Sequence, residues 1–240
     1  LSFKNPDTWL PGDCLITNDP WIGAGHLQDI IMAYPIFVKD ELFGFTLIAA
    51  HGPDIGGSLY SALSREIFEE GLRIPICYYA RGGKIDEVVK RIIMANVRVP
   101  EKVIGDLEGM NLCLERAGQK VCGLIESITA DLYLACVDQI VDRSKTAMVE
   151  AISEVPNGTF TSHLTTSGLE EEVTISCSVT VNDSTIEVDY CGTTSEQKYG
   201  INVPLCYTYA HTVYPLKCLF APDIPNNHGS LLPLTVGAPK

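Results

Sequence analysis

Two short segments place an aspartate three residues after a histidine. They are "GAGHLQD", with His26 and Asp29, and "HGPDIGG", with His51 and Asp54. Each lies at the end of a predicted strand and beside glycines, which let the backbone approach a ligand closely. Imidazole nitrogen and carboxylate oxygen together suit zinc, manganese or iron. The spacing therefore predicts one shared site for a divalent metal ion.

A plainer interpretation of the same segments stays open. Asp19 and Asp54 would cap turns through their side chains, as aspartate commonly does in loops. Each histidine would then make one hydrogen bond within its loop. The repeated His-x-x-Asp pattern favours the metal site, but the spacing by itself fits both interpretations.

Four further polar residues are candidates for contact with a substrate or for holding a loop. Asp19 precedes His26 in the stretch "TNDPWIGAGHLQD". Glu70 and Arg73 lie in "FEEGLRIP", where an ion pair that orients a loop is the simpler interpretation. Asn96 lies in "ANVRVP", with the same two alternatives.

Composition excludes several classes of function. The 240 residues include 17 Lys and Arg against 30 Asp and Glu, a net charge of -13, which repels nucleic acid and anionic membrane surfaces. The apolar runs are too short to span a bilayer. Neither a complete dinucleotide fingerprint nor a phosphate loop is present, so any ATP chemistry has to come from elsewhere. Nine cysteines without a C-x-x-C pair predict free thiols in a reducing cytoplasm.

The sequence patterns of the elements that must position these residues predict an α+β fold with mixed sheets. Residues 10–60 contain short β-branched and aromatic runs separated by glycine-rich loops. A long amphipathic helix is expected to begin at Pro100, and a second to run from Ala130 to about Ile152. Residues 159–191 alternate like a β-hairpin. We expect three regions: a strand and loop region over 1–99 with the metal site, a central helical hairpin over 100–155, and a β-hairpin followed by a buried helix and a loop over 156–240.

Longer motifs resemble those of the hydantoinase B/oxoprolinase family and occur in this order along the chain. They are "PGDCLITNDPWIGAGHLQDI", "HGPDIGG", "EIFEEGLRIP", "ANVRVPEKVIGDL", "NVPL" and "PDIPNNHGSLLPLTVGAP". The resemblance covers essentially the whole chain. It implies the middle portion of a longer subunit, since both ends look cut, and a partner that is an ATP-binding subunit of the hydantoinase A type.

The resemblance also implies an activity and a set of metal ligands. Subunits of this family take part in ATP-dependent opening of hydantoins, 5-oxoproline and lactams, and related subunits serve ketone carboxylases. By position, the metal-binding histidines of the family fall on His26 and His51. Asp29 and Asp54 become candidates for metal binding or for orienting a catalytic water. A further metal-binding aspartate of the family falls upstream of Leu1.

Two departures from the family pattern leave the coordination number and the substrate open. "GAGH" stands where many members have "GGTH", and "HGPDIGG" where many have "HHADIGG", so one histidine common in relatives is absent. The expected function is that of a cytoplasmic B-type subunit in a metal-dependent, ATP-coupled cyclic amide hydrolase. The alternatives are a subunit of a ketone carboxylase and a non-catalytic subunit that braces an ATPase partner.

Overall fold

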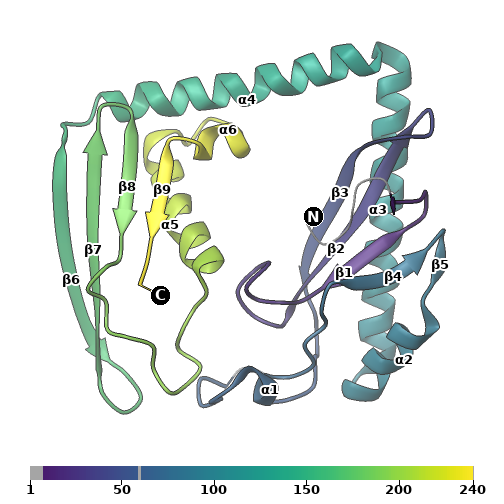
Figure 1. Cartoon of the computed structure of the whole chain (residues 1–240), viewed down its shortest axis with the longest axis horizontal. Helices are drawn as coiled ribbons and strands as arrows, with labels where there is room; N and C mark the ends of the chain where they lie inside the picture. The colour runs from purple at the N-terminus through teal and green to yellow at the C-terminus, as the bar shows by residue number, and fades with distance from the viewer. Residues whose placement is uncertain (1–7, 59–60, 240) are drawn as a thin grey trace. The chain divides into compact units, whose positions relative to one another are not determined.

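The computed structural model describes residues 8–58 and 61–239, which form two compact units. The first unit comprises the described residues up to Thr129 together with Tyr199–Ile201, and the second comprises the rest. Both contain a β-sheet and helices, which confirms the predicted α+β class (Figure 1). The three-region division expected from the sequence stays a prediction.

The sheet of the first unit has five antiparallel strands in the order β3-β2-β1-β4-β5. Their bounds are β1 Cys14–Thr17, β2 Asp29–Val38, β3 Glu41–His51, β4 Cys77–Arg81 and β5 Lys84–Ile85. β2 and β3 form a long hairpin whose turn residues Lys39 and Asp40 both have positive φ, at 52° and 66°. This turn geometry matches the twist of the two strands. The hairpin therefore has a fixed register, and it pairs the first residue of β2, Asp29, with the last residue of β3, His51.

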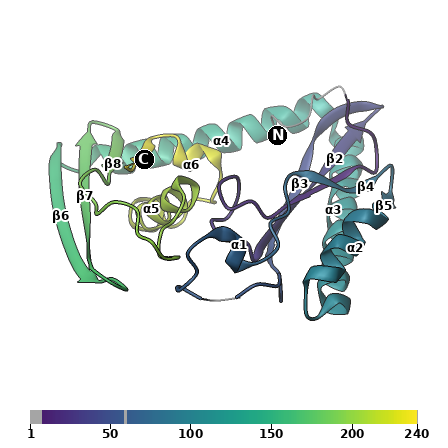
Figure 2. The ribbon, with the colours of Figure 1, turned by 60° about the horizontal axis from the view of Figure 1, so that its bottom comes forward.

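Three helices belong to the first unit: α1 Ile67–Glu70, α2 Glu87–Asn96 and α3 Pro100–Ile128. α3 begins at the proline that the sequence indicated and packs along β2 and β3 (Figure 2). Its apolar face buries Val103, Leu107 and Leu114 against strand residues such as Met32 and Tyr79. This core fixes the sheet whose ends carry the histidine and aspartate motifs.

The second unit combines a four-stranded sheet with three helices. Its elements are α4 Ala130–Ser153, β6 Gly158–Ser167, β7 Glu172–Asn182, β8 Thr185–Asp189, α5 Leu205–Phe220, α6 His228–Leu231 and β9 Leu234–Gly237. The strand order is β6-β7-β8-β9, with β9 parallel to β8 and the other pairs antiparallel. The predicted helix from Ala130 and the predicted β-hairpin are both confirmed.

The helix α5 differs from the expectation of a buried helix. Thr212, Val213 and Lys217 are buried, whereas Tyr214 and Leu219 are exposed. Its sequence is apolar on all sides, but in this unit only one side packs on the core. In the part of the chain that the structure describes, no helix is both long and apolar enough to cross a membrane.

Candidate metal centre

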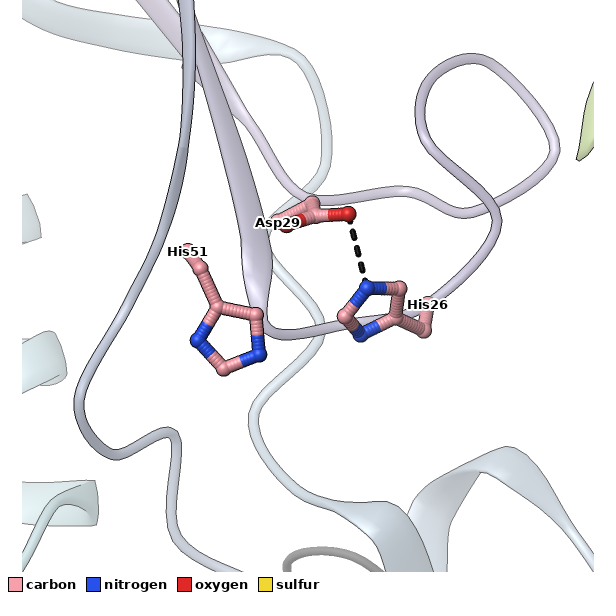
Figure 3. A group of neighbouring side chains, drawn as sticks. All are labelled: His26, Asp29 and His51. Atoms are coloured by element: carbon pink, nitrogen blue, oxygen red, sulfur yellow. Dashed lines mark ion pairs between the residues drawn. The ribbon is translucent and has the colours of Figure 1, made fainter. Parts of the chain in front are cut away.

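Three of the predicted ligands, His26, Asp29 and His51, lie together at one end of the β2–β3 hairpin. One ligand atom from each residue lies within 4.8 Å of the other two (Figure 3). Asp29 and His51 are neighbours because the hairpin register places them opposite each other. His26 comes from the loop that leads into β2, and its ring centroid lies 5.4 Å from that of His51. The side chains are accessible, since His26 and Asp29 are partly exposed and His51 is exposed.

Both ring nitrogens of His26 have an oxygen partner. Nε2 lies 2.7 Å from Oδ2 of Asp29, and Nδ1 lies 2.8 Å from Oε1 of Gln28. An amide oxygen can only accept, so this contact forms in the tautomer that carries the proton on Nδ1. In that tautomer, Nε2 presents a lone pair beside the Asp29 carboxylate. Nε2 and the neighbouring carboxylate oxygen could then both bind one metal ion.

The donor set fits a divalent transition metal. Two imidazoles and one carboxylate are ligands of zinc, manganese and iron, and histidine ligands usually make a hydrogen bond through the second ring nitrogen. Gln28, which is 5% exposed, supplies that second contact to His26. Its backbone oxygen also accepts a hydrogen bond from Gly52 N at 2.6 Å, which ties the His26 loop to the residue after His51. Sequence reasoning missed Gln28, although it lies between two predicted ligands.

Asn18 holds the loop that carries His26, and sequence reasoning did not single it out. The side chain is 1% exposed, and Nδ2 donates to the carbonyl oxygens of Leu27 at 2.8 Å and Leu72 at 2.9 Å. Oδ1 accepts from Ile74 N at 2.6 Å. A buried amide with these contacts cross-links two loops far apart in the sequence. The sequence signal that could have identified Asn18 is its position, as a polar residue directly after the apolar strand β1.

Asp54 lies outside the group of three, although it follows His51 with the same spacing as Asp29 follows His26. Its side chain is buried, and Oδ1 accepts from Gly56 N and from Nη1 of Arg98, both at 2.9 Å. Oδ2 accepts from the backbone N–H of Arg98. Burial raises the pKa of the Asp54 carboxyl, but the hydrogen bonds and charge of Arg98 and the Gly56 hydrogen bond outweigh it, so the pKa is lowered. These contacts match the turn-capping interpretation of this residue.

Both carboxylate oxygens of Asp19 also accept hydrogen bonds within the fold. Its Oδ1 accepts from Trp21 N at 3.1 Å, and its Oδ2 accepts from Nη2 of Arg73 at 2.5 Å and from Nε at 3.2 Å. The Arg73 guanidinium carbon lies 5.2 Å from the centroid of the Trp21 ring. The ion pair expected to orient a loop therefore forms, with Asp19 as the partner of Arg73 in place of the neighbouring glutamates.

Glu70 lies close enough to His26 for the two charges to interact. Burial raises the pKa of the Glu70 carboxyl, and the charge of His26 acts in the opposite direction. Gly57 helps to place this glutamate, because its φ is +56° and an added Cβ would lie 2.3 Å from the carbonyl carbon of Glu70. Among the four substrate or loop candidates, Glu70 is the one with an interaction that reaches the group of potential metal ligands.

Asn96 has a local role at the end of α2. The side chain is exposed, and Nδ2 donates to Ile92 O at 2.8 Å, one turn earlier in the same helix. This contact keeps the side chain on its own helix. It agrees with the interpretation of Asn96 as a residue that holds local structure.

The fold and the group of His26, Asp29 and His51 together define an α+β protein with a candidate metal centre at the end of a hairpin. The family model described as Hydantoinase B/oxoprolinase matches residues 2–240, so the chain belongs to that family. The resemblance noted in the sequence is therefore confirmed.

Relatives and solved structures agree with this assignment. A putative D-/L-hydantoinase B-type subunit of Pseudomonas sp. (strain NS671) is 30% identical over 98% of this chain and 43% of that protein. The ATP-dependent caprolactamase of Pseudomonas jessenii has a similar structure, with a TM-score of 0.87, 26% identity, and coverage of 96% of this chain and 41% of that chain.

A more distant structure shows the fold alone. Acetone carboxylase matches with a TM-score of 0.83 and 16% identity over 93% of this chain and 32% of that chain. The chain thus spans less than half the length of each of these three proteins.

Proposed function

We propose that this chain carries the metal-binding part of a B-type subunit in an ATP-dependent cyclic amide hydrolase. The observation that carries the proposal is the meeting of His26, Asp29 and His51 at one end of the β2–β3 hairpin. Support for the substrate class comes from the similar proteins whose names specify a hydantoinase and a caprolactamase. Hydantoins and lactams share a cyclic amide bond.

The residues that would hold the metal are His26, His51 and Asp29. A zinc, manganese or iron ion held there would polarise an amide carbonyl and lower the pKa of a water molecule. Gln28 keeps Nδ1 of His26 engaged and so directs Nε2 towards the site. Asp29 lies beside both histidines and is the one predicted catalytic aspartate that we retain.

Asp54 receives a structural role in this proposal. Its two oxygens already accept hydrogen bonds from Arg98 and Gly56, so ligation of a metal ion would require these contacts to break. We propose that Asp54 supports the His51 loop by tying it to the residues after α2. Glu70, which is partly buried near His26, is the remaining candidate for contact with a substrate.

ATP is assigned to a separate, A-type subunit. The sequence contains no phosphate loop, and the name of the similar Pseudomonas hydantoinase protein specifies one subunit of a larger enzyme. Because ATP is supplied in the cytoplasm, we propose that the assembly works there. The full reaction would need both subunits.

Metal analysis of the full-length protein tests the proposal. We expect near-stoichiometric zinc, manganese or iron in the wild type, and its loss from both His26→Ala and His51→Ala. His163→Ala is the matched control, because His163 lies on β6 in the second unit and belongs to no group of potential ligands in the described residues. A wild-type protein that holds no metal and cannot be loaded would instead support the non-catalytic assembly role.

A second assay separates the hydrolase from the carboxylase alternative. With the ATP-binding partner present, we expect ADP release to depend on a hydantoin or a lactam. Release that depends on a ketone together with bicarbonate would identify the carboxylase branch. The structural similarity to acetone carboxylase does not favour that branch, because at this identity it concerns the fold alone.

A further inference from the structure

The loop that carries Glu70 is joined to the loop that carries His26 through one buried side chain. Nδ2 of Asn18 donates to the carbonyl oxygen of Leu27 at 2.8 Å and to that of Leu72 at 2.9 Å. Leu27 follows His26 directly, and Leu72 lies two residues after Glu70. Backbone groups next to the histidine and next to the glutamate therefore meet at one nitrogen atom.

The segment that contains Glu70 is also joined to the loop that follows β3. Two backbone hydrogen bonds, of 2.8 and 2.9 Å, connect residues 69–72 to residues 55–58. Gly71 permits this close approach, because its φ is +149° and an added Cβ would lie 2.7 Å from a backbone oxygen of the other segment. Glu70 is thus attached to the segments beside both histidines, and its charge interacts with that of His26.

The carboxylate of Glu70 differs from neighbouring carboxylates in its hydrogen bonds. Asp19 and Asp54 accept from arginine side chains, and Oε2 of Glu69 accepts from Arg65 N at 2.8 Å. Among the described residues, no hydrogen bond or ion pair engages the Glu70 carboxylate, which is partly buried. A carboxylate has two oxygens that only accept hydrogen bonds. Glu70 can therefore accept from a donor group on a bound molecule.

A small cyclic amide presents its two polar groups on one edge. The ring forces the amide bond into the cis form, so the carbonyl oxygen and the N–H point to the same side. An ordinary trans amide presents them on opposite sides. Recognition of the cis edge requires a cation site for the oxygen and, beside it, an acceptor for the N–H. The group of potential metal ligands and the Glu70 carboxylate are such a pair.

We propose that Glu70 accepts a hydrogen bond from the ring N–H of a cyclic amide whose carbonyl oxygen faces His26, Asp29 and His51. The inference rests on the proposed function and adds a specificity-determining residue to it. Glu70 would select a cis amide with a free N–H over a trans amide and over an N-alkylated ring. The contacts of residues 69–72 fix the backbone at Glu70 before a ligand arrives, which lowers the cost of binding.

Three simple amides test this role with the full-length, zinc-loaded protein. They are 2-pyrrolidinone, its N-methyl derivative, which lacks the N–H, and N-methylacetamide, which is trans. Ligand-observed NMR titration measures the dissociation constant of each. We expect the wild type to bind 2-pyrrolidinone more tightly than the other two by about tenfold or more, because the hydrogen bond has a charged acceptor.

Variants of two neighbouring glutamates show whether Glu70 is the acceptor. Glu70→Met should bind 2-pyrrolidinone and its N-methyl derivative within about twofold of each other, because the acceptor is gone. Glu70→Gln keeps an acceptor oxygen and should retain part of the preference. Glu69→Met is the matched control and should keep the full preference, because Glu69 accepts from Arg65 N. Zinc affinity should be unchanged in all three variants.

The outcomes separate this inference from the proposed function. A wild type that cannot be loaded with metal would contradict both. A zinc-loaded wild type without a preference for 2-pyrrolidinone would overturn the role of Glu70 and leave the metal centre in place. A Glu70→Met variant that keeps the wild-type preference, or that loses zinc, would overturn it in the same way.

Discussion

The two His-x-x-Asp segments have the same spacing but different structures. In the first, His26 Nε2 lies 2.7 Å from Asp29 Oδ2, and both side chains are partly exposed. In the second, His51 is exposed beside the first pair, whereas Asp54 is buried and bound by Arg98 and Gly56. Three of the four residues therefore form one group of potential metal ligands, and the fourth holds a loop.

The difference arises from the backbone that follows each histidine. Asp29 is the first residue of β2, so the hairpin presents its side chain next to His51. Asp54 follows the end of β3, in a loop that turns towards the residues after α2, where it meets Arg98. Equal spacing gives equal chemistry only when the backbone after the histidine takes the same path.

The largest effect we expect distinguishes the two aspartates by metal binding. Asp29→Ala should weaken metal affinity more than about 100-fold, beyond the loss that is usual when a residue outside the ligand set is changed. Asp54→Asn should leave the affinity nearly unchanged as long as the protein is folded. Titration of the metal-free full-length protein with zinc or manganese measures both, and equal losses in the two variants would contradict the assignment.

The next effect concerns stability, where substitution of Asp54 should matter more than substitution of Asp29. Asp54→Asn should lower the free energy of unfolding by about 2 kcal/mol, because buried hydrogen bonds from charged and backbone donors to a carboxylate are weakened. Asp29→Asn should change it little in the absence of metal, since that side chain is partly exposed. Urea unfolding of the two metal-free variants beside the wild type provides the comparison.

The stabilisation by Asp54 should also depend on pH. Its folded-state pKa is lowered below the ordinary value of about 3.9, so the stabilisation is present above that value and is lost as the pH falls through the lowered pKa. The difference in unfolding free energy between the wild type and Asp54→Asn should therefore shrink below about pH 4. A difference that grows on acidification would argue against a lowered pKa.

A smaller effect should reveal how His26 is oriented. Gln28→Met retains a side chain of similar length but loses the oxygen that engages Nδ1, so metal affinity should fall by about tenfold. The position of the imidazole proton, measured by nitrogen NMR of the metal-free protein, should also shift from Nδ1 towards Nε2. If the proton position on the His26 ring is unchanged in Gln28→Met, Gln28 does not orient His26.

The smallest effect should come from the Asp19 and Arg73 pair. Arg73→Met removes the ion pair and the contact with Trp21, and we expect a loss of about 1 kcal/mol in unfolding free energy because the arginine is partly exposed to solvent. Metal affinity should stay within about twofold of the wild type, since neither residue belongs to the ligand group. A larger loss of metal would bring this pair into the candidate site.

Local patterns were sufficient for most of the elements. Pro100 marked the start of α3, and the alternating residues indicated β7 and β8. Such signals depend on neighbours within a few positions, which the sequence displays directly. The one-sided exposure of α5 was not predictable in this way. The helix has apolar residues of its own on all sides, so only packing decides which side is covered.

By itself, the sequence determined the order of the motifs, the family they resemble and the donor types of a candidate metal centre. The tertiary structure alone decided that Asp29 joins the two histidines, that Gln28 holds His26, and that Arg98 occupies Asp54. The reason is that a carboxylate takes its role from the donors around it, and those of Asp54 include a residue 44 positions away. Residue type and spacing identify groups capable of binding a metal, whereas long-range contacts determine which of them remain available to do so.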